Sequence, residues 1–320
     1  MKRSDASEGY SAPDAALLAL GQDLREAGYD FSTVTPLTQA RINRRPGNER
    51  AKDYAGVFGW SRPFAEDLLP PSLLARMEAA GVLAVCKDGW RSTVRLSTLG
   101  QQLFFHSAYP TISPDSVFFG PDTVRFASAI QAHLRVRWTP VMRAVDIGCG
   151  AGPGGLLIAG AAPDAHVLML DINAAALRFS RINAALNRTP NVEVRRSDIL
   201  KDTSGTFDLI VSNPPYLLDP GGRAYRHGGG HLGEGLSVAI LEAAVASLSP
   251  GGTLLLYTGS AIVDGVDGFR TAAEQRLAGT THHWSYFEMD PDVFGEELEA
   301  GIYAEADRIA AVVLTVTRED

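Results

Sequence analysis

Short apolar runs alternate with helical segments over much of this chain, and this alternation constrains the fold more than any other feature. Five runs each end in a polar residue or a glycine: RAVDIG, HVLMLDIN, VEVRRSD, FDLIVSN and GGTLLLYTG. The segments at 153–162, 174–187 and 236–248 repeat their apolar residues every three or four positions. Alternating strands and helices predict a parallel, doubly wound α/β sheet that binds ligands at the carboxyl ends of its strands.

Two further strand-like runs, HHWSYFEMD and RIAAVVLTVTR, lie near the end of the chain with no obvious helix between them. Such a pair predicts an antiparallel finish to the sheet. We therefore expect a seven-stranded, mostly parallel, Rossmann-like sheet with an antiparallel C-terminal strand.

The first 112 residues follow a different pattern. They contain helical segments from Pro13 to about Glu26 and at 70–81, and then two strand-like runs within 82–99 around a Lys-Asp-Gly turn. Helices followed by a hairpin suggest a small, winged-helix-like α+β domain. A chain of 320 residues is long for one ordinary domain. We therefore predict two domains: 1–112, which covers the substrate or forms a homodimer, and 113–320, which carries the sheet.

Composition narrows the class of protein. Hydrophobic residues make up 45% of the chain, and no apolar run approaches the length of a membrane-spanning helix. A largely disordered protein is thereby excluded, and we expect no membrane partner. The N-terminus lacks the apolar core of a signal peptide, and two cysteines allow at most one disulfide. The expected location is the cytoplasm.

Charge is unevenly distributed along the chain. The net charge of −8 arises entirely within residues 121–320, and an acidic domain repels a polyphosphate backbone. The segment 41–52 instead concentrates basic side chains around a Pro-Gly turn. We interpret it as a solvated loop or helix end in preference to a binding patch.

The loop Val145-Asp146-Ile147-Gly148-Cys149-Gly150-Ala151-Gly152 joins a predicted strand to a predicted helix. Its glycines allow a tight turn and a close approach of the backbone to a ligand. Position 153 is Pro, so the loop departs from the G-x-G-x-x-G/A pattern of dinucleotide sites, and the chain holds no Walker-type phosphate loop. The tighter loop suits a ligand without a pyrophosphate.

Acidic residues mark three successive strands of the predicted sheet. Asp146 precedes the glycine loop, Asp171 ends the second strand and Asp198 ends the third. An acid placed like Asp171 can accept both hydroxyls of a ribose. Asp198 or its neighbouring backbone can meet an adenine amino edge.

These residues resemble the class I S-adenosylmethionine-dependent methyltransferases, and the resemblance covers about residues 140–320. It implies S-adenosyl-L-methionine as cofactor, with the glycine loop packed against its methionine part and the acids at its ribose and adenine. The implied cofactor-binding residues are Asp146, Gly148, Gly150, Gly152, Asp171, Ile172, Asp198, Ile199 and Asn213. No metal is expected.

The fourth strand runs into Asn213-Pro214-Pro215-Tyr216. Two prolines fix φ and offer no N–H, so the segment is rigid and extended. The motif resembles the [DN]-P-P-[YFW] signature of amino-group methyltransferases, which act on exocyclic base amines, glutamine amides and related nitrogens. The implied catalytic residues are Asn213 and Pro214, whose oxygens each accept one N–H, and Tyr216, which stacks on the planar group.

Three other segments are expected to border the substrate. In 116–123 we assign Phe119 and Thr123 to the rim of the site, while Phe118 fits the core equally well. The glutamine-amide methyltransferases carry an Arg-Pro-Glu-rich sequence here, and this chain departs from it. The glycine-rich loop 221–235 is expected to form a substrate site or lid, with His227 and His231 as ordinary loop residues. Glu288 opens an acidic stretch that would attract a cation.

The leading hypothesis is methylation of a small, cationic guanidinium or amine of amino-acid type, such as arginine, in a natural-product pathway. The alternative is a macromolecular substrate, either an rRNA base or a glutamine side chain in a translation protein. A non-catalytic binding module is a third hypothesis, which the intact Asn-Pro-Pro-Tyr motif disfavours.

Overall fold

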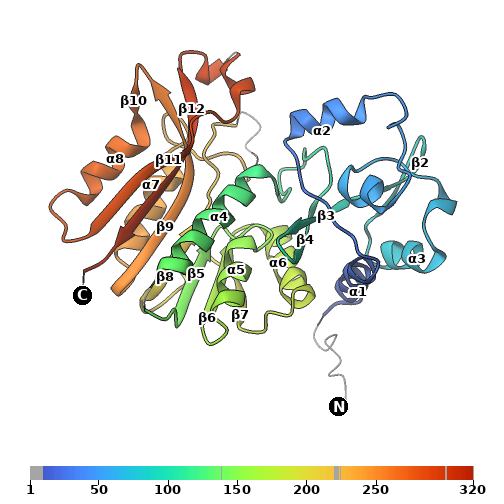
Figure 1. Cartoon of the computed structure of the whole chain (residues 1–320), viewed down its shortest axis with the longest axis horizontal. Helices are drawn as coiled ribbons and strands as arrows, with labels where there is room; N and C mark the ends of the chain where they lie inside the picture. The colour runs from blue at the N-terminus through green and yellow to red at the C-terminus, as the bar shows by residue number, and fades with distance from the viewer. Residues whose placement is uncertain (1–9, 138, 220–222, 224, 300, 320) are drawn as a thin grey trace.

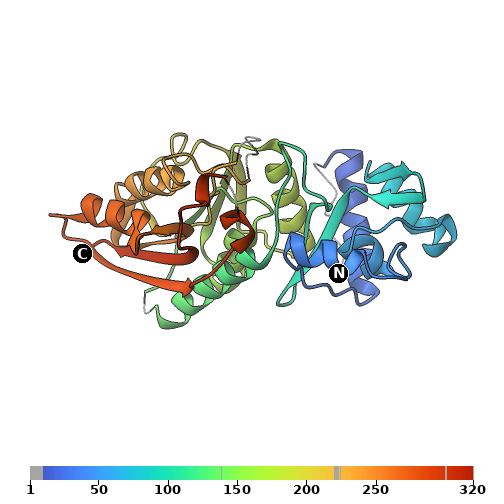
Figure 2. The ribbon, with the colours of Figure 1, turned by 90° about the horizontal axis from the view of Figure 1, so that it is seen from above.

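The computed structural model describes residues 10–319 except 138, 220–222, 224 and 300. The first nine residues, where we looked for a signal peptide, and positions 221, 222 and 224 of the glycine-rich loop lie outside the described residues. Figures 1 and 2 show a smaller N-terminal part beside a larger part that is built on a central sheet.

The central sheet has the strand order β11-β12-β9-β8-β5-β6-β7, with the short β10 paired to β9. Every pairing among β7, β6, β5, β8 and β9 is parallel, whereas β12 runs antiparallel to both of its neighbours. The predicted mostly parallel sheet with an antiparallel C-terminal strand is confirmed. Its strands are β5 (Arg143–Ile147), β6 (His166–Asp171), β7 (Val192–Arg196), β8 (Phe207–Ser212), β9 (Leu248–Val263), β10 (Val266–Asp267), β11 (His283–Asp290) and β12 (Arg308–Thr317).

Helices cover both faces of this sheet, as the alternating pattern of β6 shows. Val167 and Met169 pack toward one helical layer, while Leu168 and Leu170 pack toward the other. The first layer consists of α4 (Pro121–Val136), α5 (Pro153–Ala161) and α6 (Ala174–Leu186); the second consists of α7 (Gly235–Val245) and α8 (Gly268–Leu277). Burial on both faces explains why inner parallel strands such as β6 and β8 are apolar runs, whereas the outermost parallel strand β7 is partly exposed and carries charged residues.

The N-terminal part is helical before it becomes a pair of hairpins. Its elements are α1 (Ala12–Glu26), α2 (Pro36–Asn43), short helices at Ala55–Gly59 and Glu66–Leu68, α3 (Pro71–Ala79), β1 (Leu83–Cys86), β2 (Gly89–Ser92), β3 (Val94–Leu99) and β4 (Gln102–Ser107). We expected one strand over 91–99, but the chain breaks at Thr93. As a result β2 pairs with β1, and β3 pairs with β4 in a separate sheet.

Two asparagines of α6 join the N-terminal part to the sheet part. The Asn183 side chain accepts from the Phe105 N–H at 2.8 Å and donates to the Phe105 carbonyl at 3.0 Å. Asn187, one turn later, makes the same pair of bonds to Leu103 at 3.0 and 2.8 Å. Because a carboxamide offers the donor and acceptor of a peptide group, α6 completes the edge of β4. These bonds thereby anchor β4 of the N-terminal part to a helix of the sheet part.

Among the helices of the described residues, none is both long and apolar enough to cross a membrane.

Candidate active site

The site lies where the strand order reverses beside β5. β6 flanks β5 on one side and β8 on the other, which is the switch point where open α/β sheets bind ligands. Ile147 is in register with Ser212, and the Ser212 hydroxyl donates to the Ile147 carbonyl at 2.8 Å. The glycine loop and the Asn-Pro-Pro-Tyr segment therefore leave the sheet side by side.

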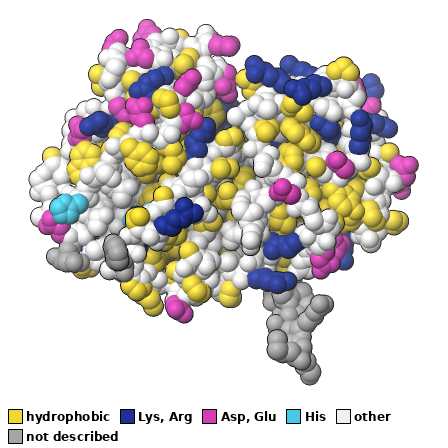
Figure 3. All heavy atoms as spheres, in the orientation of Figure 1, with side chains coloured by type: hydrophobic (Ala, Val, Ile, Leu, Met, Phe, Trp, Pro, Cys, Tyr) yellow, Lys and Arg dark blue, Asp and Glu magenta, His cyan; other side chains and the backbone are white. Residues whose placement is uncertain are grey.

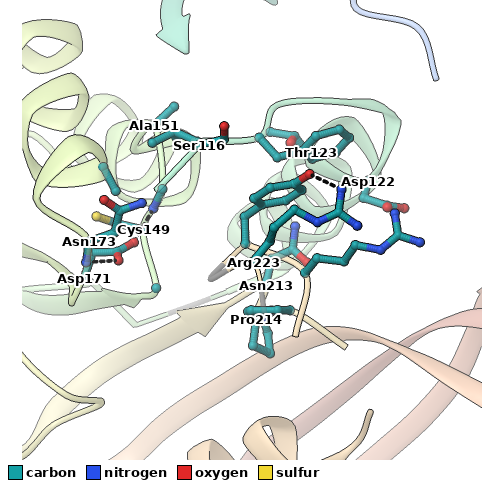
Figure 4. A pocket seen from close by; sticks show the side chains of 18 of the residues that line it. Ser116, Asp122, Thr123, Cys149, Ala151, Asp171, Asn173, Asn213, Pro214 and Arg223 are labelled. Carbon is teal, nitrogen blue, oxygen red and sulfur yellow. Dashed lines mark hydrogen bonds between the residues drawn. The ribbon is translucent and has the colours of Figure 1, made fainter. Parts of the chain in front are cut away.

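One cavity of about 390 Å³ contains both segments. Figure 4 shows its two halves. Asp171, Asn173, Cys149 and Ala151 lie in one half, which we call the cofactor half. The second, the acceptor half, carries Asp122, Thr123, Asn213, Pro214 and Arg223.

The glycine loop is open toward the cofactor half. Gly148 has φ +68° and no heavy atom within 4 Å of where a Cβ would stand. Gly150 has φ +55° and its N–H donates to Asp171 Oδ2 at 2.9 Å. Such a backbone is accessible to glycine at low cost and leaves room for a ligand at the loop.

Two carboxylates support the loop, the half-buried Asp171 and the buried Asp146. Asp171 accepts from the N–H groups of Gly150 and Asn173 at 2.9 and 2.8 Å. Burial raises its pKa, and these hydrogen bonds oppose the rise. Asp146 accepts from the Gly155 N–H at 2.8 Å, and its burial raises its pKa to about 7. Both carboxylates line the cavity; Asp146 is 1% exposed, whereas Asp171, at the end of β6, is the more exposed of the two.

The far end of the cofactor half is formed by the ends of β6 and β7. Ile172, Asp198 and Ile199 all line it. Ile199 has φ +53°, which is rare for a β-branched residue and is found mostly where function requires it. Asp198 is ion-paired with the exposed Lys201, so its carboxylate faces solvent at the rim.

The Asn-Pro-Pro-Tyr segment forms the floor of the acceptor half. Asn213, Pro214 and Tyr216 all line the cavity. The Tyr216 ring packs against Gly259 so closely that a Cβ on residue 259 would strike the ring. Phe294 packs against Tyr216 in a T-shaped arrangement, with 5.9 Å between the ring centroids. With 7% of its surface exposed, Tyr216 is a fixed wall.

Two residues expected at the site lie elsewhere. Gly152 caps α5 and packs against Met169, away from the cavity lining. Phe119 is 1% exposed and stacks on His106, while its neighbour Phe118 lines the cavity. The expected rim residue is therefore wrong by one position, because the extended segment turns alternate side chains inward and outward. Thr123 lines the cavity as expected.

Glu288 is also outside the cavity lining. It lies on β11 near the edge of the sheet, and both of its oxygens accept from Arg308 at 2.8 Å. β11 is two strands away from β9 and four away from β5. Our expectation that this carboxylate borders the acceptor was wrong, because the sheet order separates the two.

The structure adds residues that the sequence reasoning missed. The first is Asp122, which is 8% exposed at the start of α4. It accepts from the hydroxyls of Tyr216 and Tyr257, both at 2.7 Å, and from Arg125 at 3.0 Å. The sequence signal that could have found Asp122 is the helix start at Gly120-Pro121. The other missed residues come from two different loops and also line the cavity: Phe118, Arg223 and Tyr225.

The hydrogen bonds of Asp122 to Tyr216 and its neighbours should contribute measurably to the stability of the protein. Changing Asp122 to alanine should lower the free energy of unfolding by about 2–4 kcal/mol, because Arg125 and two buried hydroxyls lose their acceptor. Denaturant unfolding measures this. Asp290→Asn, which removes only the other partner of Arg125 at 2.7 Å, should cost under about 1 kcal/mol. Equal costs for both variants would contradict the role of Asp122.

Comparison with known proteins agrees with this geometry. Residues 112–262 match the family model of the methyltransferase small domain. A release factor glutamine methyltransferase of Cereibacter sphaeroides is 32% identical over 222 residues, which cover 65% of this chain and 74% of the relative. The chain belongs to the methyltransferase small domain family. It is thus a class I S-adenosylmethionine-dependent methyltransferase with S-adenosylmethionine as cofactor.

Other relatives match shorter stretches of this methyltransferase. A release factor glutamine methyltransferase of Deinococcus radiodurans is 38% identical over 48% of this chain, and the chain spans 55% of that relative. A ribosomal RNA small subunit methyltransferase C of Haemophilus influenzae is 45% identical over 74 residues, 23% of this chain and 22% of the relative. A transferase of Pyrococcus horikoshii shares the fold with a TM-score of 0.50 at 12% identity, covering 78% of this chain and 83% of that one.

The cofactor half fits S-adenosylmethionine on its own chemistry. The open loop at Gly148 leaves room for the methionine part, and Asp171 offers carboxylate oxygens where ribose hydroxyls would lie. Changing Asp171 to alanine should weaken binding of S-adenosylhomocysteine by about 1.5–3 kcal/mol, the range for a hydrogen bond to a charged group. Isothermal titration calorimetry measures this. Unchanged affinity would remove Asp171 from the ribose role.

Proposed function

We propose that this methyltransferase transfers a methyl group to the side-chain amide nitrogen of a glutamine in a protein. The observation that carries the proposal is the single cavity that joins the cofactor half to Asn213 and Pro214. A nitrogen held by these two oxygens faces the glycine loop across the cavity.

The chemistry asks little of the protein beyond orientation. When bound, S-adenosylmethionine supplies an electrophilic methyl carbon; the nitrogen lone pair forms the new C–N bond, the C–S electron pair stays on sulfur, and one nitrogen proton leaves to water. The lone pair of an amide nitrogen is delocalised into its carbonyl. The Asn213 side-chain oxygen and the Pro214 carbonyl would each accept one N–H and turn the nitrogen toward tetrahedral geometry. Alignment of this kind contributes up to about 7–11 kcal/mol.

The charges around the acceptor half favour a neutral acceptor over a cationic one. Glu288 is outside the cavity lining and paired with Arg308. The Asp122 carboxylate is already bonded to two tyrosines and Arg125. Arg223 and Arg226 line the cavity. Each of these cations is itself paired with a carboxylate, Arg223 with Asp219 and Arg226 with Glu297. With Glu288 and Asp122 already engaged, a guanidinium substrate lacks the carboxylate partner that we expected from the sequence, and the small cationic substrate loses its main support. Two relatives, matched over 222 and 165 residues, are named for glutamine, whereas a relative from Streptomyces pristinaespiralis, matched over 172 residues, is named for 4-amino-L-phenylalanine.

The test follows the fate of labelled methyl groups. Purified methyltransferase and methyl-labelled S-adenosylmethionine are incubated with three pools: soluble protein from cells lacking glutamine methyltransferases, total rRNA and free amino acids including arginine. We expect label in protein. Acid hydrolysis should release it as volatile methylamine, because an N-methyl amide hydrolyses while methylated lysine and arginine survive. Label confined to RNA or to free amino acids would overturn the proposal.

A second candidate substrate is an exocyclic amine of rRNA, and one surface favours it. Arg41, Arg44, Arg45, Arg50 and Lys52 are all exposed on the N-terminal part. Within the described portion of the chain none of them forms an ion pair with a carboxylate. Blue side chains gather accordingly over this region in Figure 3. Pro36, which begins the neighbouring α2, lines the cavity. The same labelling experiment separates this candidate from the glutamine, since its label would appear in the RNA pool.

A further inference from the structure

Arg223 is held over the acceptor half by a buried carboxylate behind it. Asp219 has 2% of its side chain exposed and accepts from Arg223 Nε at 2.9 Å and also from Nη2. Arg226 adds a second cation near the same carboxylate, at 3.7 Å. Together these bonds lower the pKa of Asp219 to about 2, so the clamp persists through the physiological pH range. A forked pair of this kind fixes both position and orientation of the guanidinium.

Tyr225 fixes the other side of the guanidinium. Its hydroxyl lies 3.3 Å from Arg223 Nη1 and donates to the Thr111 carbonyl at 2.8 Å. Its ring stacks on Phe118 with 5.9 Å between centroids and an interplanar angle of 11°. The linker of the N-terminal part therefore holds Tyr225, which in turn holds Arg223.

Two of the N–H donors of Arg223 have no partner among the described residues. A guanidinium has five N–H donors, and the bonds to Asp219 and Tyr225 account for three of them. In Figure 4 the side chains of Arg223 and Asn213 lie in the same half of the cavity, on the side opposite Asp171. An acceptor group placed at Asn213 thus has a preoriented double donor beside it.

An amide acceptor poses a problem that this arrangement answers. The carbonyl oxygen of a neutral amide carries more of the delocalised electron density than its nitrogen and competes with it for an alkylating group. A site that methylates nitrogen must hold the oxygen elsewhere. In the proposed mode Asn213 and Pro214 meet the N–H groups through their oxygens, and an oxygen acceptor cannot bind the amide oxygen. Arg223 supplies donors that can.

We propose that Arg223 is a specificity-determining residue that binds the carbonyl oxygen of the acceptor amide and turns it away from the transferred methyl group. This rests on the proposed glutamine substrate. Because the contact exists before and during transfer, it contributes to binding more than to the chemical step. A site that hydrogen-bonds a substrate group also discriminates strongly against analogues that lack it.

The experiment uses an unmethylated release factor as probe, with Arg223→Ala, Arg223→Lys and Tyr225→Phe variants of the full chain. We expect Arg223→Ala to raise KM by roughly 10–100-fold while kcat changes less than about threefold, the pattern of lost ground-state binding. Arg223→Lys should recover part of the loss. Tyr225→Phe, which removes one of the contacts that orient Arg223, should raise KM by a few fold. S-adenosylhomocysteine affinity reports whether the cofactor half stays intact in each variant.

The outcomes separate this inference from the proposed function. If the wild type methylates the glutamine and Arg223→Ala has wild-type KM, the role of Arg223 is refuted and the proposed function stands. A fall in kcat alone, or loss of S-adenosylhomocysteine binding together with activity, would also refute it, because Arg223 would then act on chemistry or on folding. If the wild type does not methylate the release factor but labels RNA, both proposals fail together.

Discussion

Replacing Asn213 with alanine is expected to lower kcat by about 10²–10³-fold, the range for losing one preorganised polar contact to a reacting group. Asn213 supplies the only side-chain oxygen in the Asn-Pro-Pro-Tyr segment that lies beside the reacting nitrogen in our proposal, and it follows directly on β8. Pro214 would still accept one N–H, so some activity should remain. Steady-state kinetics on the substrate found in the labelling experiment measures the effect.

Asn173 provides the matched control. It is another asparagine that lines the cavity, but it lies in the cofactor half, where its side chain caps α6 through the Ala175 N–H at 2.9 Å. Asn173→Ala should weaken S-adenosylhomocysteine binding and leave kcat at saturating cofactor within a few fold. If Asn213→Ala retained wild-type kcat, the proposed grip on the nitrogen would be wrong.

Replacing Gly233 with alanine is expected to lower both the stability and the kcat of the enzyme, although Gly233 does not line the cavity. Gly233 has φ +100°, and a Cβ there would strike the carbonyl oxygen of Tyr216. The clash and the backbone strain together should cost about 2–4 kcal/mol of unfolding free energy. Because the displaced backbone belongs to the Asn-Pro-Pro-Tyr segment, we also expect kcat to fall at least about 10²-fold, as a misplacement near 1 Å would cause.

Gly229 is the control for this substitution. It lies in the same loop with φ +68°, but no heavy atom lies within 4 Å of its Cβ position. Gly229→Ala therefore tests left-handed strain without the clash, and should cost about 1–2 kcal/mol while sparing kcat. Thermal unfolding and turnover are measured on both variants. Equal loss of activity in the two would show that Gly233 does not support the site.

These glycines change the interpretation of the loop at 221–235. From sequence it was expected to form a substrate site or lid. In the structure its described part after His227 packs beneath the motif: the Gly228 N–H donates to the Leu217 carbonyl at 2.7 Å, and the Leu236 N–H donates to the Gly228 carbonyl at 2.7 Å. The glycines allow one backbone to lie against another, so they support the site from below. Earlier in the loop, Arg223, Tyr225 and Arg226 do line the cavity.

The sequence alone determined the main strands of the central sheet, the glycine loop, the acids at strand ends and the Asn-Pro-Pro-Tyr segment, because each is a local pattern. Backbone φ, side-chain alternation and the period of a helix depend only on neighbours in the chain. The same local logic predicted that β12 would pair antiparallel, since the described residues between it and β11 form short 3-10 turns and no α-helix.

Only the tertiary structure decided what surrounds the acceptor. Asp122 meets Tyr216 and Tyr257 across 94 and 135 residues, and Tyr225 meets Thr111 across 114. Glu288 fits the acidic pattern equally well, yet the strand order places it away from β5. A hydrogen bond between distant segments leaves no periodicity in either one. The charge at the acceptor, and with it the favoured substrate class, therefore followed from which loops the sheet brings to one edge.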